Sequence, residues 1–362
     1  DVVTTFVPWS RALVEFQAGN PDGADDAARI AEGVALPFGD LQRVLECRAI
    51  RASTATMRGN VDEADRGFAE LDKLRGGGPD YWGTLLTLLS RPHRARLHGD
   101  LAAALGAAEA NQALAVGLSS AWFMCSTRLD VAYFRLLAGD GAAAREHARA
   151  ALDEAAALAA DLLLYGAQLM VAATNPEDET RAMAAALQIA DARDYRFLIP
   201  HAVRLPQLDA ALWRALETDA GNRAAVLLEG TGPASVAALR PLIPDLSETA
   251  AVRAVAVLRA VGAQGRDALG RLAAVSNRRV AAAAKDALAA LEAANPHRLS
   301  PRELEVIQLL AQGLRTKEIA AHLVLTPATV STHIQRIMGK TGTSSRAELL
   351  AMAAREAPRA VK

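Results

Sequence analysis

The distribution of apolar residues near the C-terminus predicts four short helices. Apolar side chains recur there at helical spacing and give each segment one face to bury, over residues 301–312, 316–323, 327–339 and from 344 or 345 onward. Ser300 is a favourable N-cap for the first helix, and Glu303 three residues later completes a capping box. Thr316 is the predicted N-cap of the second helix.

The third predicted helix carries a polar face. Thr326 is its predicted N-cap and Pro327 opens it, which is a strong start signal. Three residues at i, i+4 and i+7 should be buried: Val330, Ile334 and Ile337. The side chains left outward are Ser331, Thr332, Gln335 and Arg336. Two short helices joined by a short turn, the second exposing polar and basic side chains, form a helix-turn-helix whose second helix fits the major groove of DNA.

Phosphate contacts would accompany this arrangement. Basic side chains neutralise phosphates and supply most of the affinity for DNA. Thr326 and Thr329 lie at a predicted helix N-terminus, which itself favours a phosphate. His333 has no catalytic partner beside it in the sequence, so we interpret it as a packing residue.

Residues 299–354 resemble the LuxR-type helix-turn-helix domain of bacterial transcription regulators. The segments that carry this resemblance are Leu299–Glu303, Gly313-Leu314, Lys317–Ala320, Thr329–Ile334, Lys340 and Ser345-Arg346. The resemblance runs through the whole domain without a gap, although the domain is a small part of the chain. It implies that the third helix reads the major groove. It also implies that the fourth helix pairs two domains, so that a homodimer binds double-stranded DNA.

The resemblance assigns roles to nine residues. By position, Ser331, Thr332 and Gln335 would face bases. The residues that would face phosphate or brace the fold are Lys317, Thr326, Thr329, Arg336, Lys340 and Arg346. The sequence departs from the family at Ser331, where a basic residue is usual, and at Thr341 and Thr343, where apolar residues are usual. A weakly charged reading face leaves an alternative open, namely a protein-interaction scaffold whose helix-turn-helix no longer binds DNA specifically.

A repeat of 40 residues organises the first part of the chain. The dipeptides Gly19-Asn20, Gly59-Asn60, Gly99-Asp100 and Gly139-Asp140 recur at that step. So do two series of alanines, one at Ala24, Ala64, Ala104, Ala144 and Ala184, the other at Ala12, Ala52, Ala132 and Ala172 with Pro92 in the missing place. Gly followed by Asn or Asp suits the turn between antiparallel helices, because both tolerate positive φ. The pattern resembles the tetratricopeptide repeat, whose usual length is 34.

We therefore expect an all-α chain of three parts. A tetratricopeptide-like solenoid would occupy residues 1–220, short HEAT-like helical pairs residues 221–294, and the LuxR-type domain residues 295–362. Helical solenoids form extended concave surfaces. Four aromatic residues recur near one another in the repeat frame and could line a groove for a small-molecule or protein effector: Trp82, Trp122, Tyr133 and Tyr165. Ordinary packing between repeats is the simpler interpretation of the same residues.

Charge is distributed unevenly along the 362 residues. The net charge is −1, but residues 296–362 hold ten Lys or Arg against five Asp or Glu, and the remainder holds 30 against 36. A basic C-terminal domain on an acidic body fits a nucleic-acid reader. Cys47 and Cys125 have no CxxC neighbour, so we expect reduced thiols, no metal and a cytoplasmic protein.

Catalysis is not expected from this sequence. Gly339-Lys340-Thr341 lacks the glycine that a phosphate-binding loop needs five residues before its Gly-Lys pair, because Ile334 stands there. We expect no cofactor, no signal peptide and no apolar run of transmembrane length. The chain begins at Asp1 and its composite pattern resembles the C-terminal part of large LuxR regulators that carry an ATPase upstream.

Overall fold

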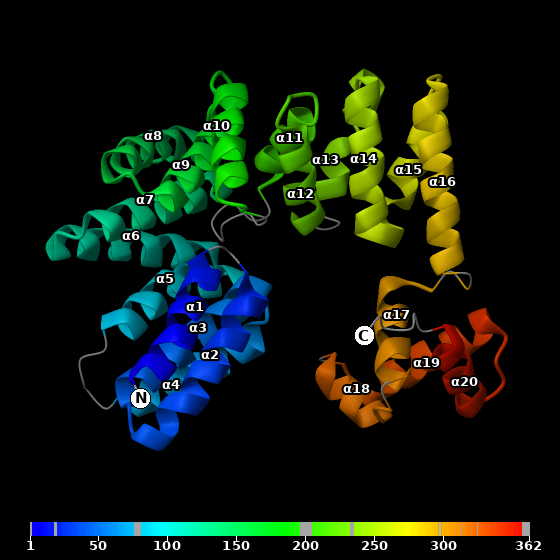
Figure 1. The fold of residues 1–362 in the computed structure, drawn as a ribbon, viewed down its shortest axis with the longest axis horizontal. Helices are drawn as coiled ribbons and strands as arrows, with labels where there is room; N and C mark the ends of the chain where they lie inside the picture. Colours follow the sequence, from blue (N-terminus) through cyan, green and yellow to red (C-terminus); the bar gives the residue numbers. More distant parts are fainter. Residues whose placement is uncertain are drawn as a thin grey trace. The chain divides into compact units, whose positions relative to one another are not determined.

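The computed structural model describes residues 2–17, 20–75, 81–195, 205–231, 235–295, 297, 299–311, 313–323 and 325–356 (Figure 1). Within these ranges the chain forms helices and no strands, which confirms the all-α prediction. The chain divides into two compact units, Asp1–Val257 and Leu258–Lys362. The division falls inside one helix rather than after residue 220 or 294, and the predicted three-part division stays a prediction.

The first unit is built from sequential helices. They are α1 (Val2–Gln17), α2 (Pro21–Ala35), η1 (Leu36–Phe38), α3 (Leu41–Arg58), α4 (Val61–Arg75), α5 (Tyr81–Leu97), α6 (Leu101–Leu118), α7 (Ala121–Leu137), α8 (Gly141–Leu158), α9 (Asp161–Thr174), α10 (Glu179–Ala192), α11 (Pro206–Ala215), α12 (Gly221–Thr231), α13 (Val236–Leu239), η4 (Ile243–Asp245) and α14 (Glu248–Val261). From α1 to α10 each helix contacts the next, and α1 contacts α3, α3 contacts α5, and α7 contacts α9. We call α1–α10 the array.

The glycines of the 40-residue repeat make the turns between helices. Gly59, Gly99 and Gly139 have φ of 75°, 82° and 84°, the left-handed region that glycine enters without strain. The next residue then caps the following helix, as when the Asp100 carboxylate accepts the backbone N–H of Ala103 at 2.8 Å. The turn predicted from the dipeptides is confirmed at these three places, and Gly19 lies outside the described residues.

A second set of turns alternates with the first and was not evident in the sequence. Gly39, Ser119 and Ala159 each lie midway between the predicted turns and have φ of 67°, 50° and 50°. The backbone therefore enters the left-handed region at intervals of 20 residues from Gly39 to Gly59 and from Gly99 to Ala159. Residues other than glycine occupy two of these sites, at a cost of about 1–2 kcal/mol each. The 20-residue interval is therefore not evident from the positions of the glycines.

The repeated alanines form the contacts between helices, with one exception. Ala24, Ala64, Ala104 and Ala144 are completely buried. Ala184, predicted to continue the series, is only half-buried. The N-cap of α10 is Asp178, two residues earlier than the repeat predicts, so Ala182 takes the buried place with 3% exposure. The prediction for Ala184 is wrong because α9 ends early, at Thr174.

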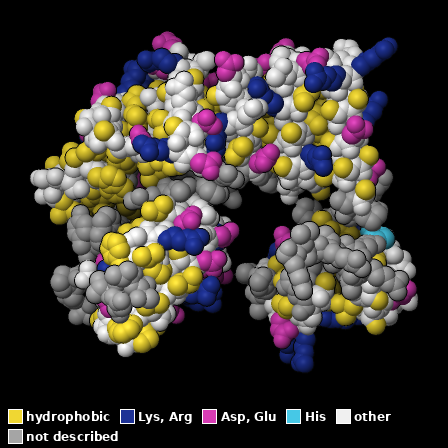
Figure 2. All heavy atoms as spheres, viewed as in Figure 1, with side chains coloured by type: hydrophobic (Ala, Val, Ile, Leu, Met, Phe, Trp, Pro, Cys, Tyr) yellow, Lys and Arg dark blue, Asp and Glu magenta, His cyan; other side chains and the backbone are white. Residues whose placement is uncertain are grey.

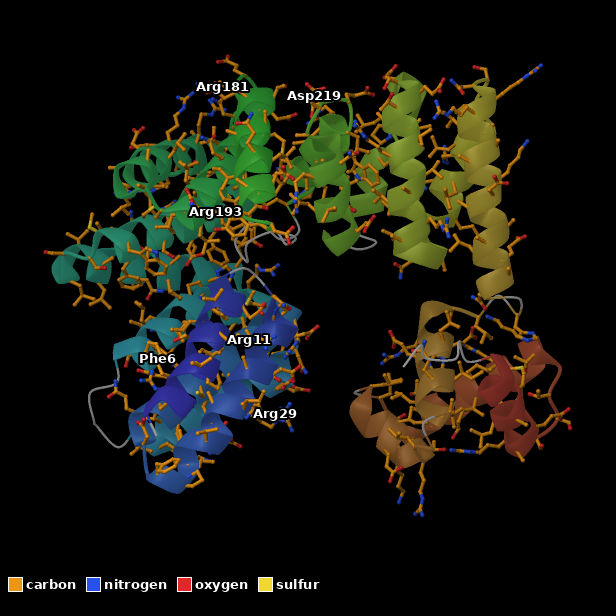
Figure 3. The ribbon with its side chains drawn as sticks, in the orientation of Figure 1. Phe6, Arg11, Arg29, Arg181, Arg193 and Asp219 are labelled. Carbon is orange, nitrogen blue, oxygen red and sulfur yellow. The ribbon has the colours of Figure 1, made fainter. Side chains whose placement is uncertain are left out.

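Ion pairs link consecutive helices of the array. Arg193, just after α10, pairs with Asp161 at the start of α9, whereas Arg181 near the other end of α10 bonds Asp178, the N-cap of its own helix, at 2.6 Å (Figure 3). Arg128 of α7 pairs with Glu154 of α8 at 2.9 Å. Charged side chains of the array are thus used repeatedly to hold neighbouring helices in register.

Helix α6 corrects one expectation from the sequence. By length and composition alone its 18 residues could cross a membrane, whereas no apolar run of that length was expected. One face of α6 packs against α5 and α7, and 28% of the stretch is buried. A single helix of this length and composition is weak evidence for a membrane span.

The second unit contains the end of α14, η5 (Gly262–Gly265), α15 (Arg266–Ala273), α16 (Arg278–Ala294) and four further helices. These four are α17 (Pro301–Ala311), α18 (Thr316–His322), α19 (Pro327–Thr341) and α20 (Arg346–Glu356). We call residues 299–356 the head. Helices α15 and α16 pack together, while their predicted HEAT-like character stays a prediction.

The four helices predicted for the head are confirmed. Their buried side chains share one core: Leu299, Val306, Ile307, Leu309, Leu310, Ile319, Ala320, Val330, Ile334, Ile337 and Leu349. Helix α19 extends two residues beyond the predicted end, because Gly342 rather than Gly339 takes the left-handed conformation that ends it, with φ of 70°. Lys340 therefore lies inside the helix, in its last turn.

Candidate nucleic-acid interface

The first helix of the head begins with the predicted capping box. The Ser300 backbone N–H donates to Glu303 Oε2 at 2.7 Å, and the Glu303 N–H donates to Ser300 Oγ at 3.3 Å. These two bonds satisfy N–H groups that a helix start otherwise leaves without partners. Arg302 on the same turn donates to the carbonyl oxygen of Leu323, just after α18. The capping box therefore fixes the start of α17, and the bond from Arg302 holds the end of α18, the short helix that precedes α19.

Helix α18 starts one residue away from the predicted cap. Thr316 is its first helical residue, and the Arg315 backbone N–H donates to Glu318 Oε2 at 2.6 Å. Thr316 is free of the capping role and its hydroxyl instead accepts a bond from Arg346 Nη1 at 2.9 Å. The prediction failed because a glutamate three residues on caps the helix start as effectively as a threonine hydroxyl.

Helix α19 is formed as the sequence predicts. Thr326 Oγ1 accepts the Thr329 backbone N–H at 3.1 Å and lies 2.8 Å from Thr329 Oγ1. Val330 and Ile337 are completely buried and Ile334 is 8% exposed. The hydroxyls of Thr326 and Thr329 are therefore held together at the helix N-terminus, where backbone dipoles favour an anion.

The outward face of α19 presents an uncharged polar row and one cation. Ser331, Thr332, Gln335 and Arg336 are all exposed. Ser331 Oγ donates to the carbonyl of Pro327 at 2.9 Å, and Thr332 Oγ1 donates to the carbonyl of Ala328 at 3.1 Å. Each hydroxyl therefore donates its hydrogen bond to a backbone carbonyl of the helix, and its oxygen lone pairs remain available as acceptors.

Lys340 does not project freely from α19. Its Nζ lies 2.6 Å from Glu303 Oε2, and the Glu303 side chain is only 5% exposed. Burial would raise the pKa of Glu303, but the bonds from Lys340 and Ser300 outweigh it and hold that pKa below its usual range. Of the two roles that the resemblance allowed, the geometry supports a brace between α19 and the capping box of α17.

Arg346 makes a similar brace at the other end of the head. Besides Thr316, its guanidinium donates to the carbonyl oxygen of Leu314 at 3.1 Å. These bonds join the start of α20 to the connection between α17 and α18. Ser345 caps α20 by accepting the Glu348 N–H at 3.2 Å, which agrees with the predicted start of the fourth helix.

Two of the predicted basic residues project freely into solvent. Lys317 and Arg336 are exposed and make no ion pair within the described residues. Arg315, which sequence reasoning passed over, is also exposed. Cations at the N-terminal end of a helix oppose its dipole, so Arg315 and Lys317 gain nothing locally by lying at the start of α18. Figure 2 shows Lys and Arg side chains that stand out from the head beside α18.

The four aromatic residues of the candidate effector groove do not form an open surface together. Tyr133 and Tyr165 are completely buried. Trp122 is half-buried against Leu85, Ala115 and Phe123. Trp82 lies in α5, but its side chain is outside the described residues. For the two tyrosines the structure agrees with ordinary packing between helices, because a side chain without exposed surface cannot line a groove.

Comparison with known proteins gives the head a family. Residues 297–353 match the family described as bacterial regulatory proteins, luxR family. Residues 297–353 form a LuxR-family helix-turn-helix domain. A putative HTH-type transcriptional regulator of Mycobacterium bovis is 42% identical over 57 residues, which are 16% of this chain and 6% of that protein. The response regulator Rre1 of Synechocystis is 46% identical over 54 residues, 15% of this chain and 23% of that protein.

The similarity is confined to this domain. The probable transcriptional regulatory protein NarL of Mycobacterium tuberculosis is 47% identical over 58 residues, 16% of this chain and 27% of that protein. The chain therefore covers about a quarter or less of the length of these relatives. No solved structure matches the chain. The LuxR-family assignment holds for the head, and the tetratricopeptide-like character of the array stays a prediction.

Proposed function

We propose that this chain is a bacterial, cytoplasmic transcription regulator that binds double-stranded DNA through α19. The observation that carries the proposal is the division of α19 into two faces. Val330, Ile334 and Ile337 hold one face in the core of a LuxR-family domain, while the opposite face exposes polar groups at the spacing that a major groove can receive.

Each exposed residue of α19 has a role that follows from its chemistry. The Gln335 amide can donate and accept together, which suits the paired groups on the major-groove edge of adenine. The oxygens of Ser331 and Thr332 are acceptors and suit the amino groups of adenine or cytosine. Arg336, with Arg315 and Lys317 of the preceding helix, supplies sequence-independent contacts to phosphates.

Pairing of two heads would occur through α20. The resemblance assigns that role to the fourth helix, and Ala347 and Ala351, one turn apart on α20, are both exposed. Small side chains at this spacing let a second helix approach closely. An inverted repeat in the operator would match such a two-fold pair of heads.

The array would act as the sensor. An effector, either a small molecule or a protein, would bind one of two states of the molecule more tightly and so change the fraction of heads free to bind DNA. We propose no catalytic activity for this chain. Any ATP hydrolysis would belong to a separate domain of the kind found upstream in the large regulators that it resembles.

A selection experiment tests the proposal directly. The chain is incubated with a random duplex library at two salt concentrations, and bound sequences are recovered over several rounds. We expect an inverted repeat, with affinity that falls steeply as salt rises because phosphate contacts release counterions. Recovery of no sequence above the input library would contradict the proposal.

The Gln335→Ala variant separates base reading from phosphate contact. We expect it to relax the preference at one position of each half-site, at a cost of about 1–3 kcal/mol for the preferred base. Gln308→Ala, the same substitution at an exposed residue of α17, is the matched control. A scaffold whose head no longer binds DNA specifically is the second candidate, favoured by Ser331 where relatives usually carry a basic residue, and it predicts weak binding that Gln335→Ala leaves unchanged.

A further inference from the structure

The outer face of α6 differs from the outer faces of the other even-numbered helices α2, α4 and α8. When these helices are aligned on the 40-residue repeat, α2, α4 and α8 expose charged side chains at corresponding positions. Examples are Asp26 of α2, Arg66 of α4 and Glu146 of α8, where α6 has Gly106. Lys73 and Asp153 correspond in the same way to Ala113 of α6. Charged side chains such as Arg29 project outward from α2 (Figure 3). Helix α6 alone presents an uncharged outer face.

The outer face of α6 is also markedly apolar. Leu114, Val116 and Leu118 are 42%, 61% and 51% exposed. Between and beside them lie exposed small residues: Ala102, Ala103, Gly106, Ala110, Ala113 and Gly117. The only charged residue of α6 is Glu109, and it is paired with Arg135 of α7. Figure 2 shows a hydrophobic patch over this part of the array. Apolar surface of this extent on a water-soluble array indicates an interaction site.

Two glycines of α6 have no explanation within the array. A Cβ atom added at Gly106 or Gly117 would meet nothing within 4 Å, so nothing in the structure requires a glycine at either place. By contrast, a Cβ at Gly67 would come within 2.9 Å of the Ala52 Cβ. A glycine inside a helix weakens that helix. Gly106 and Gly117 therefore leave room for another backbone to approach the outer face of α6 closely.

We propose that α6 is a self-association surface, which receives α6 of a second copy of this chain in antiparallel orientation. The sizes of its side chains are self-complementary about Ala110. With Ala110 on the two-fold axis, Leu114 of each copy lies over Gly106 of the other, and Ala103 lies opposite Gly117. The two-fold axis repeats the Leu114–Gly106 contact on each side of Ala110, so a large side chain meets a small residue at both places, which a parallel partner would not provide.

This interface goes beyond the proposed function because it needs no DNA and does not involve the head. It would give the array a two-fold axis of its own, so that two heads are already held within one particle before an operator is met. Linking two binding modules raises the effective concentration of the second at the DNA. The charge balance permits the contact, since Glu109 is neutralised by Arg135 on its own chain.

The oligomeric state without DNA tests the proposal. Sedimentation equilibrium of the whole chain should give twice its mass of 38.1 kDa. Leu114→Glu places a charge in the apolar contact and should raise the dissociation constant at least ~30-fold. Gly106→Leu fills the hollow that receives Leu114 and should weaken the pair while leaving the isolated array at least as stable to heat. Ile30→Glu, an exposed apolar residue on α2, is the matched control and should leave the pair intact.

Cross-linking gives a second test that does not depend on weakening the pair. Ala110→Cys places one thiol of each copy at the two-fold axis and should give a covalent dimer under mild oxidation. Ala142→Cys, equally exposed on α8, should not. The natural Cys47 and Cys125 are completely buried, and burial raises the pKa of both thiols to about 12, so they stay unreactive.

The outcomes separate this inference from the proposed function. A monomer at every concentration, or a dimer that persists in Leu114→Glu while Ala110→Cys fails to cross-link, would overturn the inference and leave DNA binding by the head untouched. Flotation of monomeric chain with phosphatidylglycerol vesicles, lost in Leu114→Glu, would also overturn it and assign the face to a lipid surface. A DNA-free dimer that binds no operator would uphold the inference and refute the proposed function.

Discussion

The array and the head differ in how they use charged side chains. In the array, arginines are paired with carboxylates on neighbouring helices, as Arg94 of α5 is with Asp65 of α4 at 2.7 Å. In the head, some basic side chains likewise bond to neighbouring helices, whereas others are exposed to solvent and make no ion pair within the described residues. This comparison indicates that the side chains available for a partner are those the fold leaves unused. By that criterion Arg315, Lys317 and Arg336 are candidates for phosphate contact, whereas Lys340 and Arg346 are braces.

Lys340→Met gives the largest expected effect and tests the distinction directly. It leaves the Glu303 carboxylate buried without its cation, and we expect the head to lose about 2–3 kcal/mol of stability. Hydrogen exchange of peptides from α17 and α19 measures the loss. Lys317→Met, which removes an exposed lysine, is the control. If Lys340→Met leaves exchange unchanged but lowers DNA affinity, Lys340 is a phosphate contact after all.

The same pair makes the stability of the head depend on pH. The folded-state pKa of Glu303 lies below its ordinary value, so the ion pair stabilises the head fully above that ordinary value. The stabilisation is lost as pH falls through the depressed pKa. Protection of the amides of α17 and α19, taken relative to the intrinsic exchange rate at each pH, should therefore fall at acidic pH in the native chain, and Lys340→Met should show a smaller change.

The displaced register of α10 can be tested with two matched substitutions. Ala182→Leu puts a large side chain into a filled contact and should cost about 1–3 kcal/mol. Ala184→Leu, at the position that the repeat predicts, should cost less because that residue is half-buried. Thermal unfolding followed by circular dichroism measures both. A larger loss in Ala184→Leu than in Ala182→Leu would mean that α10 keeps the 40-residue register.

Arg336→Ala sharpens the comparison within the head. Loss of one phosphate contact should lower affinity about tenfold for all sequences alike and reduce the slope of log affinity against log salt by about 1. Fluorescence anisotropy with an operator and a scrambled duplex measures both quantities. The head should keep its stability, since Arg336 is exposed and makes no ion pair within the described residues. A change confined to one operator sequence would instead assign Arg336 to base reading.

The smallest expected effect concerns the two kinds of turn in the array. Gly139→Ala forces a side chain into the left-handed region and should destabilise the array by about 1 kcal/mol. Ala159→Gly relieves the same strain at an alternate turn, but it also frees the unfolded chain, so a gain of a few tenths of a kcal/mol is expected. Chemical denaturation measures both changes. A loss in Ala159→Gly as large as that in Gly139→Ala would mean that Ala159 contributes packing that its backbone conformation does not reveal.

Features that depend on residues close together in the chain could be predicted without the structure. Capping of α17 and α19 involves residues three apart, and the glycine turns of the array involve neighbours. The buried row of Val330, Ile334 and Ile337 follows from helical spacing alone. Such interactions form within one or two turns of helix, so their pattern can be read without knowing how the helices pack.

Which of those residues are free to act depends on how the helices pack in three dimensions. Glu303 and Lys340 are 37 residues apart, and Arg346 reaches Thr316 across 30. The burial of Tyr133 and Tyr165 depends on neighbouring helices, as does the exposed face of α6. No local pattern encodes these contacts, because they arise when helices distant in sequence are packed together. The residues left over after that packing are the ones on which we base the function of the head and the pairing of the array.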